Sequence, residues 1–456
     1  MALREPEQKL FSIVLMLITM SVTNPSIAQP KAQQWTLESS VQQAIATSPE
    51  LKKSIAELGV RQADIDLSSL WPDPEIAFRV DNKMGQDDGA GGYDLTDVVV
   101  RQSIPMSRIK YQEEASSASM KAARFSQQFQ SLQVQNRVSK VFHQLQFASA
   151  KLSLAEKQLK LANEMYGQDK GGKNKSGAQV VVRYLSPLEK MRLTIIREEA
   201  KQASGSAEGK YKEALSEFVK LLGIEMDSVT SVSELLPVSD IPDLKQLTEL
   251  QNSHAQLSSQ QQEVLAANHK IDVARSSQMI DPTIGLSWSK DTLSTGREDI
   301  YGIMFNIQIP ITGRKTTAES KATYKASQQK VELQLLKREL KINLNRSYMH
   351  LNHVIEQAVE YKKKVLKPAG KMLELTNKGF TSGELNILSL VDANNTYFEA
   401  RLTYLDLIYH ARVELAEVKL YAGQLITDTQ VQNASVLNTS MQSSTALNNS
   451  VSMGGQ

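Results

Sequence analysis

The feature that most constrains the fold is a heptad pattern of apolar residues within a stretch that has no turn signal between Arg108 and Met165. Apolar residues recur there in alternating steps of four and three, which predicts a coiled-coil helix. The residues of this seam are Val134, Val138, Val141, Leu145, Ala148, Leu152, Ala155, Leu159 and Ala162. A helix over the whole stretch, at ~1.5 Å per residue, is a rod of roughly 87 Å. A helix of this length does not fit within a single compact globular domain, so we expect an elongated molecule.

The chain also repeats itself once, at a spacing of roughly 205 residues. Short segments recur in the same order, and each half reads as a helix, two strands, a very long helix and a returning helix. The paired segments are 48–51 with 254–257, 72–78 with 280–286, 104–105 with 309–310, 185–189 with 388–392, and 221–225 with 421–425. The same spacing carries the heptad seam onto Leu340, Leu344, Ser347, Leu351, Val354, Ala358, Tyr361, Val365 and Pro368. We therefore predict a tandem repeat.

Each half contains two short stretches in which apolar residues alternate with small or polar ones. We predict strands at about 74–82, 95–104, 283–290 and 300–309. This alternation is typical of a sheet with one face in lipid and the other lining water. A solvent-exposed sheet packed on a core is the alternative. Four strands are too few to close around a channel, so the lipid-facing interpretation requires several copies of the chain.

Both long helices are preceded by the same local sequence, an Ile-Pro pair followed by a bend and a basic residue. Proline at the end of a strand removes no ladder hydrogen bond, so the pair marks where each second strand stops. The predicted strand-to-helix joints are Pro105 and Arg108 in the first half and Pro310, Gly313 and Arg314 in the second. For each arginine taken alone, a solvated cation at the interface is the simpler interpretation.

The two ends of the chain carry other signals. Arg4 and Lys9 precede an apolar run at 10–20 that is shorter than the ~20 residues needed to span a bilayer. Small residues before the end of 1–28 predict a cleaved signal peptide, with a membrane anchor as the alternative. Gln29 rather than a cysteine follows the cut, so we expect no lipid anchor. The polar stretch 428–456 is predicted to be disordered.

Composition excludes several classes of function. The chain has no cysteine, and 52 basic residues nearly balance 50 acidic ones, so neither a thiolate site nor a nucleic-acid partner is expected. Its six histidines show no metal-ligand spacing beyond His350 and His353. No phosphate loop or nucleophile elbow is present. We therefore expect neither an enzyme nor a cofactor.

These features together resemble the TolC-type outer-membrane efflux proteins over roughly residues 35–425. The segments "SPLE" at 186–189 and "GELNILSLVDAN" at 383–394 are most similar to the branch that serves heavy-metal (cobalt, zinc, cadmium) exporters of the resistance-nodulation-division class. The resemblance implies a homotrimer, mainly α with a membrane β-barrel, in which a twelve-strand barrel sits on a twelve-helix periplasmic tunnel. The domains are then 29–225 and 247–427, with an equatorial linker at 226–246.

The same resemblance implies a function. The chain would be a passive duct in the outer membrane of a Gram-negative bacterium, extending into the periplasm. A periplasmic adaptor (membrane fusion) protein would couple it to an inner-membrane proton-driven pump, for export of heavy-metal cations. A channel for drugs or secreted proteins is the first alternative. A periplasmic coiled-coil adaptor or scaffold is the second, although it would show one helical hairpin rather than this duplication.

The resemblance also assigns the helix-hairpin tips. Gly383 matches a tip glycine, and Asp392 fits the second of two acidic rings at the entrance, where the first position is Ser389. Glu384 is a further gate candidate, and an ordinary surface charge is the alternative for Asp392. Phe380 and Leu385 replace a tyrosine–arginine lock found in some members. Adaptor docking is expected at the tips, at Gly383, Leu385, Ser186, Pro187, Leu188 and Glu189, with the Lys- and Gly-rich loop 167–177 as another candidate.

A second heptad pattern concerns the helix that returns from the later tip. Val391, Phe398 and Leu405 lie seven residues apart and predict its packed seam. Asp392 then lies one position beside the seam, from which it can point toward a symmetry axis.

Overall fold

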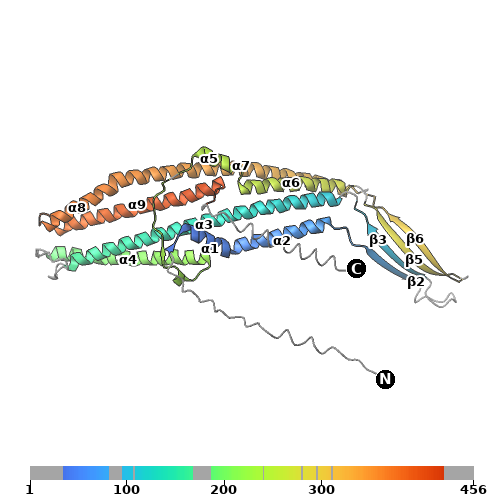
Figure 1. The fold of residues 1–456 in the computed structure, drawn as a ribbon, viewed down its shortest axis with the longest axis horizontal. Helices are drawn as coiled ribbons and strands as arrows, with labels where there is room; N and C mark the ends of the chain where they lie inside the picture. The colour runs from blue at the N-terminus through green and yellow to red at the C-terminus, as the bar shows by residue number, and fades with distance from the viewer. Residues whose placement is uncertain are drawn as a thin grey trace, which may run out of the picture.

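The computed structural model describes residues 34–81, 95–105, 108–167, 186–239, 241–278, 281–293, 296–309 and 312–425. It is elongated, with strands at one end and the ends of the helix pairs α3/α4 and α8/α9 at the other (Figure 1). The predicted signal peptide, the tail from residue 428 and nearly all of the Lys- and Gly-rich loop lie outside the described residues. Within the ranges given above, no helix is both long and apolar enough to cross a bilayer.

The two halves of the chain present their elements in the same order. The first half contains α1 (Leu37–Thr47), α2 (Pro49–Ser69), β2 (Glu75–Asp81), β3 (Leu95–Ser103), α3 (Arg108–Gly167) and α4 (Pro187–Leu222). The second contains α5 (Leu244–Gln251), α6 (Ala255–Ser276), β5 (Thr283–Leu293), β6 (Gly296–Asn306), α7 (Arg314–Tyr361), the π-helical segment η3 (Lys362–Leu366), α8 (Lys367–Thr381) and α9 (Ile387–Ala422). Side-chain caps fix several starts, as where Ser48 accepts from the Leu51 N–H directly before Pro49 of α2.

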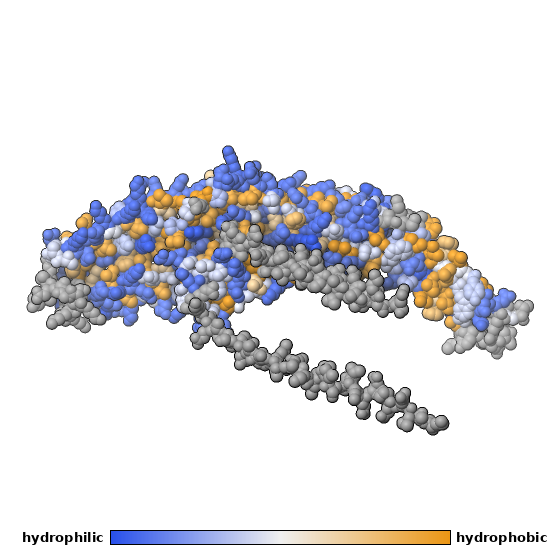
Figure 2. Space-filling model, viewed as in Figure 1, coloured by the Kyte–Doolittle hydropathy of each residue, from blue (hydrophilic) through white to orange (hydrophobic). Residues whose placement is uncertain are grey.

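The four long strands form one antiparallel sheet in the order β2-β3-β5-β6. Its register places Phe78 opposite Val98, Val98 opposite Trp288, and Trp288 opposite Tyr301, so apolar side chains of all four strands share one face. This face is open, with Phe78 75% and Tyr301 79% exposed. Figure 2 shows the resulting apolar surface at the strand end of the molecule.

The helices continue this lateral order along the molecule. Next to the sheet, α2 packs on α3, α3 on α6, and α6 on α7. Toward the tips, α4 replaces α2, α9 replaces α6, and α8 replaces α7, while α3 runs the full length (Figure 1). The molecule is therefore four columns of elements wide. The first column (β2, α2 and α4) and the fourth column (β6, α7 and α8) form its two lateral edges.

The predicted heptad seam is confirmed in α3, where Val134, Val138 and Leu145 are buried. In the second half it holds from Leu340 to Ala358 and then shifts by one residue. Leu366 and Ala369 are buried, whereas Val365 and Pro368, which the repeat spacing predicts, are exposed. The prediction at these two positions is wrong because η3 is a π-helix that inserts one extra residue into the ladder and rotates all that follows.

A linker wraps the middle of the helices. It includes β4 (Ser231–Val232), which pairs in parallel with β1 (Gln34–Trp35). The side chain of Arg412 donates to the carbonyls of Leu236 and Pro237 at 2.8 and 3.0 Å. These bonds hold the linker against one side of α9.

Candidate functional site

The tip of the second hairpin is built around Gly383, whose φ of +81° lies in the left-handed region that glycine adopts most readily. The N–H groups of Glu384 and Leu385 both donate to the Gly379 carbonyl, at 2.9 and 3.0 Å, and so end α8. Asn386 then caps α9 by accepting from the Ser389 N–H and hydroxyl, both at 2.9 Å. The predicted gate position Ser389 is therefore engaged in a helix cap, a role that sequence reasoning missed.

In the first hairpin, the returning helix α4 begins with a capping box. The Ser186 hydroxyl accepts from the Glu189 N–H at 3.3 Å, and the Glu189 carboxylate accepts from the Ser186 N–H at 2.8 Å. Pro187 occupies the first helical position, and Leu188 is exposed. These four predicted docking residues therefore include a rigid helix start and one free apolar side chain.

An apolar cluster joins the two helical hairpins near their ends. Met165 of α3 and Leu193 of α4 are buried against Ile387, Leu390 and Val391 of α9. Phe380 packs partly buried against the same cluster, where it supports the hairpin rather than a polar lock. The two hairpins therefore meet at a common height near the tips.

Asp392 is exposed beside this cluster and begins a line of carboxylates along α9. Glu399 and Asp406 follow at intervals of seven residues, so all three lie on one side of the helix. Thr403 and the imidazole of His410 lie on the same side. Sequence reasoning found only Asp392, although the seven-residue spacing of the acidic residues is visible in the printed sequence.

The acidic strip of Asp392, Glu399 and Asp406 lies on the side of α9 opposite the linker. At 3.6 residues per turn, Asp392, Glu399 and Asp406 lie roughly 120–160° around α9 from Arg412, which binds the linker. The acidic strip therefore faces away from the side that the linker covers. Val391, Phe398 and Leu405 are buried beside it, as the heptad pattern predicts.

Further along α9, nearby groups pair with the carboxylates. His410 lies 3.5 Å from Asp406, and the Glu414 carboxylate lies 3.0 Å from His350 of α7. Glu417 forms an ion pair with Lys140 of α3. Nowhere in the described ranges do three His, Cys, Asp or Glu side chains come together as a metal-ion site. A cation moving along such a surface would meet single carboxylates rather than a closed binding site.

The strand-to-helix joints differ in their chemistry. Pro105 is buried, and the preceding Ile104 donates its N–H to the Pro282 carbonyl at 2.9 Å. Arg108 starts α3 and lies 3.7 Å from Asp281, so this arginine links the two halves. Gly313 caps α7 with a φ of +62° before the exposed Arg314, and Pro310 lies outside the described residues.

The face of the sheet opposite the apolar one carries mostly small and polar side chains. Arg101 lies 4.0 Å from Glu75 of the neighbouring strand, and the Ser289 hydroxyl donates to Asp97 at 2.7 Å. The two faces of the sheet therefore contrast in polarity.

Two histidines are buried among the helices near the linker. Burial lowers the pKa of His143 to about 4, although its Nδ1 lies 2.8 Å from the Gln146 side-chain oxygen. Burial also lowers the pKa of His254, which accepts from the Gln256 N–H and reaches the Leu420 carbonyl at 3.1 Å. Both rings are structural and neutral near pH 7.

Comparison with known proteins agrees with this geometry. Residues 247–424 match the outer membrane efflux protein family. The chain is 24% identical over 258 residues to the cobalt-zinc-cadmium resistance protein CzcC of Cupriavidus metallidurans. That alignment covers 56% of this chain and 61% of CzcC, so it spans less than two thirds of the relative.

Solved outer-membrane channels share the fold at low sequence identity. The structure of CusC superimposes with a TM-score of 0.67 at 17% identity, covering 85% of this chain and 92% of CusC. The outer membrane channel CmeC of Campylobacter jejuni superimposes with a TM-score of 0.69 at 12% identity, covering 88% of each chain. The chain therefore shares its fold with these channels.

Proposed function

We propose that three copies of this chain close into the outer-membrane channel of a tripartite efflux system. The channel is a passive duct from the periplasm to the exterior, which a periplasmic adaptor couples to an inner-membrane proton-driven pump. Its cargo is heavy-metal cations. The chain enters the periplasm by a signal peptide cleaved after Ala28, and Gln29 then leaves it without a lipid anchor.

The observation that carries this proposal is the preserved order of four columns. The edge strands of the sheet are β2 and β6. The outermost helices are α2 and α7 next to the sheet, and α4 and α8 toward the tips. At every level the same two columns, the first and the fourth, are left at an edge. Two different edges that run the whole length of a molecule fit a head-to-tail contact that closes into a ring.

The lateral edges carry exposed apolar side chains that such a ring would cover. On the first column Val60 and Leu67 are exposed, and on the fourth Tyr324, Val331 and Leu335 are exposed. Unpaired backbone on β2 and β6 in lipid would be costly unless neighbouring copies pair it. Three copies supply 3 × 4 = 12 strands. At ~4.8 Å between strands and ~40° of tilt, their ring is roughly 24 Å across.

A cation cargo is supported by the acidic strip. If the linker lies on the outside of the ring, Asp392, Glu399 and Asp406 of α9 face the passage. Threefold symmetry then triples each carboxylate and concentrates cations near the entrance. The similarity to CzcC, named for cobalt, zinc and cadmium resistance, favours metal cations among those that such a duct could pass.

The proposal is tested first by assembly and conductance. The full chain in mild detergent should have the mass of a trimer by light scattering, and a monomer would refute the ring. In planar bilayers separating unequal KCl concentrations, the reversal potential should show cation preference. Cells that express the chain together with its inner-membrane pump and periplasmic adaptor should tolerate higher concentrations of cobalt, zinc or cadmium. Unchanged tolerance to all three metals would refute the metal cargo.

A further inference from the structure

We infer that a groove between α3 and α6, directly below the sheet, binds the head group of a phospholipid that carries both a phosphate and a primary ammonium group. The lipid belongs to the periplasmic leaflet of the outer membrane. This inference rests on the proposed channel and adds a lipid site on its outer surface.

The groove has a volume of about 370 Å³. Strand β3 leads into α3, and α6 leads into β5, so the groove lies directly below the β3–β5 pair (Figure 1). Its charged side chains are Lys110, Glu113, Glu114 and Lys121 of α3, and His269 of α6 lies beside them. The two lysines balance the two glutamates, so the groove suits a zwitterion better than a simple anion or cation.

The order of the chemical groups down the groove matches the order within a phospholipid. Above the groove, Ile284 and Leu286 of β5 are exposed on the apolar face of the sheet. Lys110 lies ~3 Å along α3 from its start, and Glu113 and Glu114 lie ~8–9 Å along it, at ~1.5 Å per residue. Acyl chains on the strands, a phosphate at the lysine and an ammonium group at the glutamates therefore fit one lipid molecule.

The charges on the α3 wall of the groove are available to a ligand. Within the described structure, neither Lys110 nor Glu113 forms an ion pair, and both are exposed. Glu114 is held at the groove by His269, whose Nδ1 lies 3.3 Å from its carboxylate. A primary ammonium group has three N–H donors and can bond both carboxylates, and the lysine binds phosphate as a point charge.

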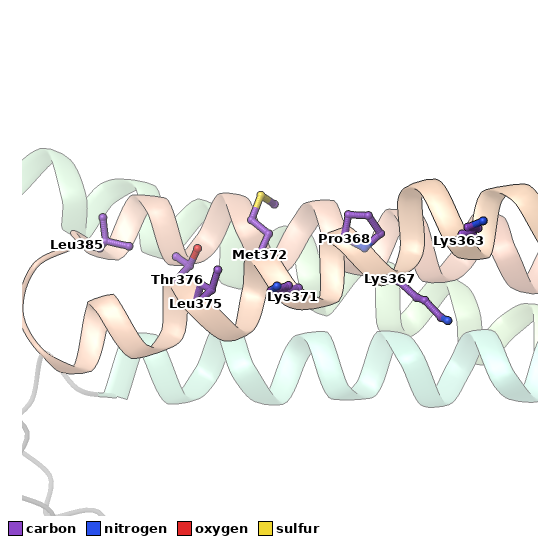
Figure 3. Close-up of a pocket in the computed structure, with 8 residues that line it drawn as sticks. All are labelled: Lys363, Lys367, Pro368, Lys371, Met372, Leu375, Thr376 and Leu385. Atoms are coloured by element: carbon purple, nitrogen blue, oxygen red, sulfur yellow. The ribbon is translucent and has the colours of Figure 1, made fainter.

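The groove along η3 and α8 near the tips differs in character (Figure 3). Lys363, Lys367 and Lys371 line it together with apolar side chains, and its described lining contains no carboxylate. Such a groove suits an anion. Of these two grooves, only the one below the sheet can bind both charges of a zwitterion.

The groove opens on the side of α3 that the linker covers further down. Gln146 of α3 donates to the linker carbonyl of Ser233 at 2.7 Å. Ser117 lines the groove on the same continuous helix, and the separation from Gln146 is a whole number of helical turns to within ~20°. In the proposed ring the linker lies on the outside, so the groove faces lipid rather than the passage.

An exposed tryptophan marks the level of the membrane surface. Trp71 lies between the end of α2 and the start of β2 and is 57% exposed. Tryptophan is enriched where the hydrocarbon of a bilayer meets water, and membrane barrels carry aromatic girdles there. Because α2 packs beside α3, this level is also the height at which the groove begins.

Native mass spectrometry of the full chain in mild detergent tests the inference. The protein is mixed with equal amounts of phosphatidylethanolamine and phosphatidylglycerol, which share the phosphate but not the ammonium group. Wild type should retain mainly phosphatidylethanolamine. Lys110→Gln should reduce the retention of both lipids roughly tenfold, whereas Glu113→Gln should reduce that of phosphatidylethanolamine alone by a similar factor. The matched control Lys321→Gln removes an exposed lysine ~10 Å along α7, outside the groove, and should behave as wild type.

The outcomes separate this inference from the proposed function. A trimer that retains phosphatidylglycerol as well as phosphatidylethanolamine, or whose preference survives Glu113→Gln, would refute the lipid site and leave the ring intact. A monomer by light scattering would refute both. The chain has no cysteine of its own, so Ser117→Cys reports occupancy of the groove by its reaction with a soluble maleimide. Protection in phosphatidylethanolamine vesicles is expected, and protection only after a periplasmic protein is added would mean that the inference is wrong.

Discussion

Acidification should loosen the linker, because it forces a proton onto the buried His143. The Gln146 side chain connects this ring to the linker: its oxygen lies 2.8 Å from Nδ1, and its amide donates to the Ser233 carbonyl at 2.7 Å. Burial lowers the pKa of His143 to about 4, and the nearby positive charge of Arg412 acts in the same direction. A charged ring is therefore strongly disfavoured in the folded protein.

The magnitude follows from proton linkage. An unfolded histidine binds its proton below about pH 6.5, and folded His143 does so only below about pH 4. Between these values the unfolded state holds more protons, so the stabilising contribution is fully present above pH 6.5 and is lost as the pH falls. At pH 4.5 the loss amounts to about 2.5 kcal/mol.

The comparison of wild type with His143→Phe measures this loss. Guanidinium unfolding, followed by the helical circular dichroism signal at pH 7.0 and 4.5, should show a drop in unfolding free energy that is about 2.5 kcal/mol smaller in the variant. His353→Phe, at an exposed position on α7, should retain the wild-type pH dependence. Equal drops in wild type and His143→Phe would mean that the ring does not control the acid sensitivity.

Three further predictions concern the gate, the tip and the linker. Asp392→Asn should reduce cation preference in bilayer recordings, Glu399→Gln should add to this effect, and Asp392→Arg should reverse the sign of the preference. Unchanged selectivity in all three variants would place the acidic strip outside the passage. Gly383→Ala should lower the free energy of unfolding by about 1 kcal/mol, because alanine disfavours a positive φ. Gly59→Ala, at an exposed position on α2, should raise it by a similar amount. Thermal melting should therefore shift in opposite directions in the two variants. Arg412→Met removes two charge-assisted hydrogen bonds and should destabilise by about 2 kcal/mol, with faster proteolysis at 236–237; an unaltered cleavage rate would mean that other contacts hold the linker.

Local periodicity explains what could be predicted near the tip of the second hairpin. Asp392 follows the buried Val391, so its exposure could be read from the heptad alone. The partner of Arg108 could not, because Asp281 lies in the other half of the chain. The cap that engages Ser389 was readable in principle from Asn386, three residues earlier. Whether Asp392 and Glu384 line a gate depends on other copies and remains a proposal.

The sequence by itself determined the type and approximate length of each long element, because side-chain periods of two and three and a half are properties of the local backbone. Tertiary structure alone decided three things. It set the lateral order of the four columns, since strands β3 and β5 from different halves pair side by side. It turned the acidic side of α9 away from the linker through the hydrogen bonds of Arg412. It also shifted the seam at η3, because one extra residue in a π-turn rotates every later side chain by roughly 100° without changing the sequence spacing.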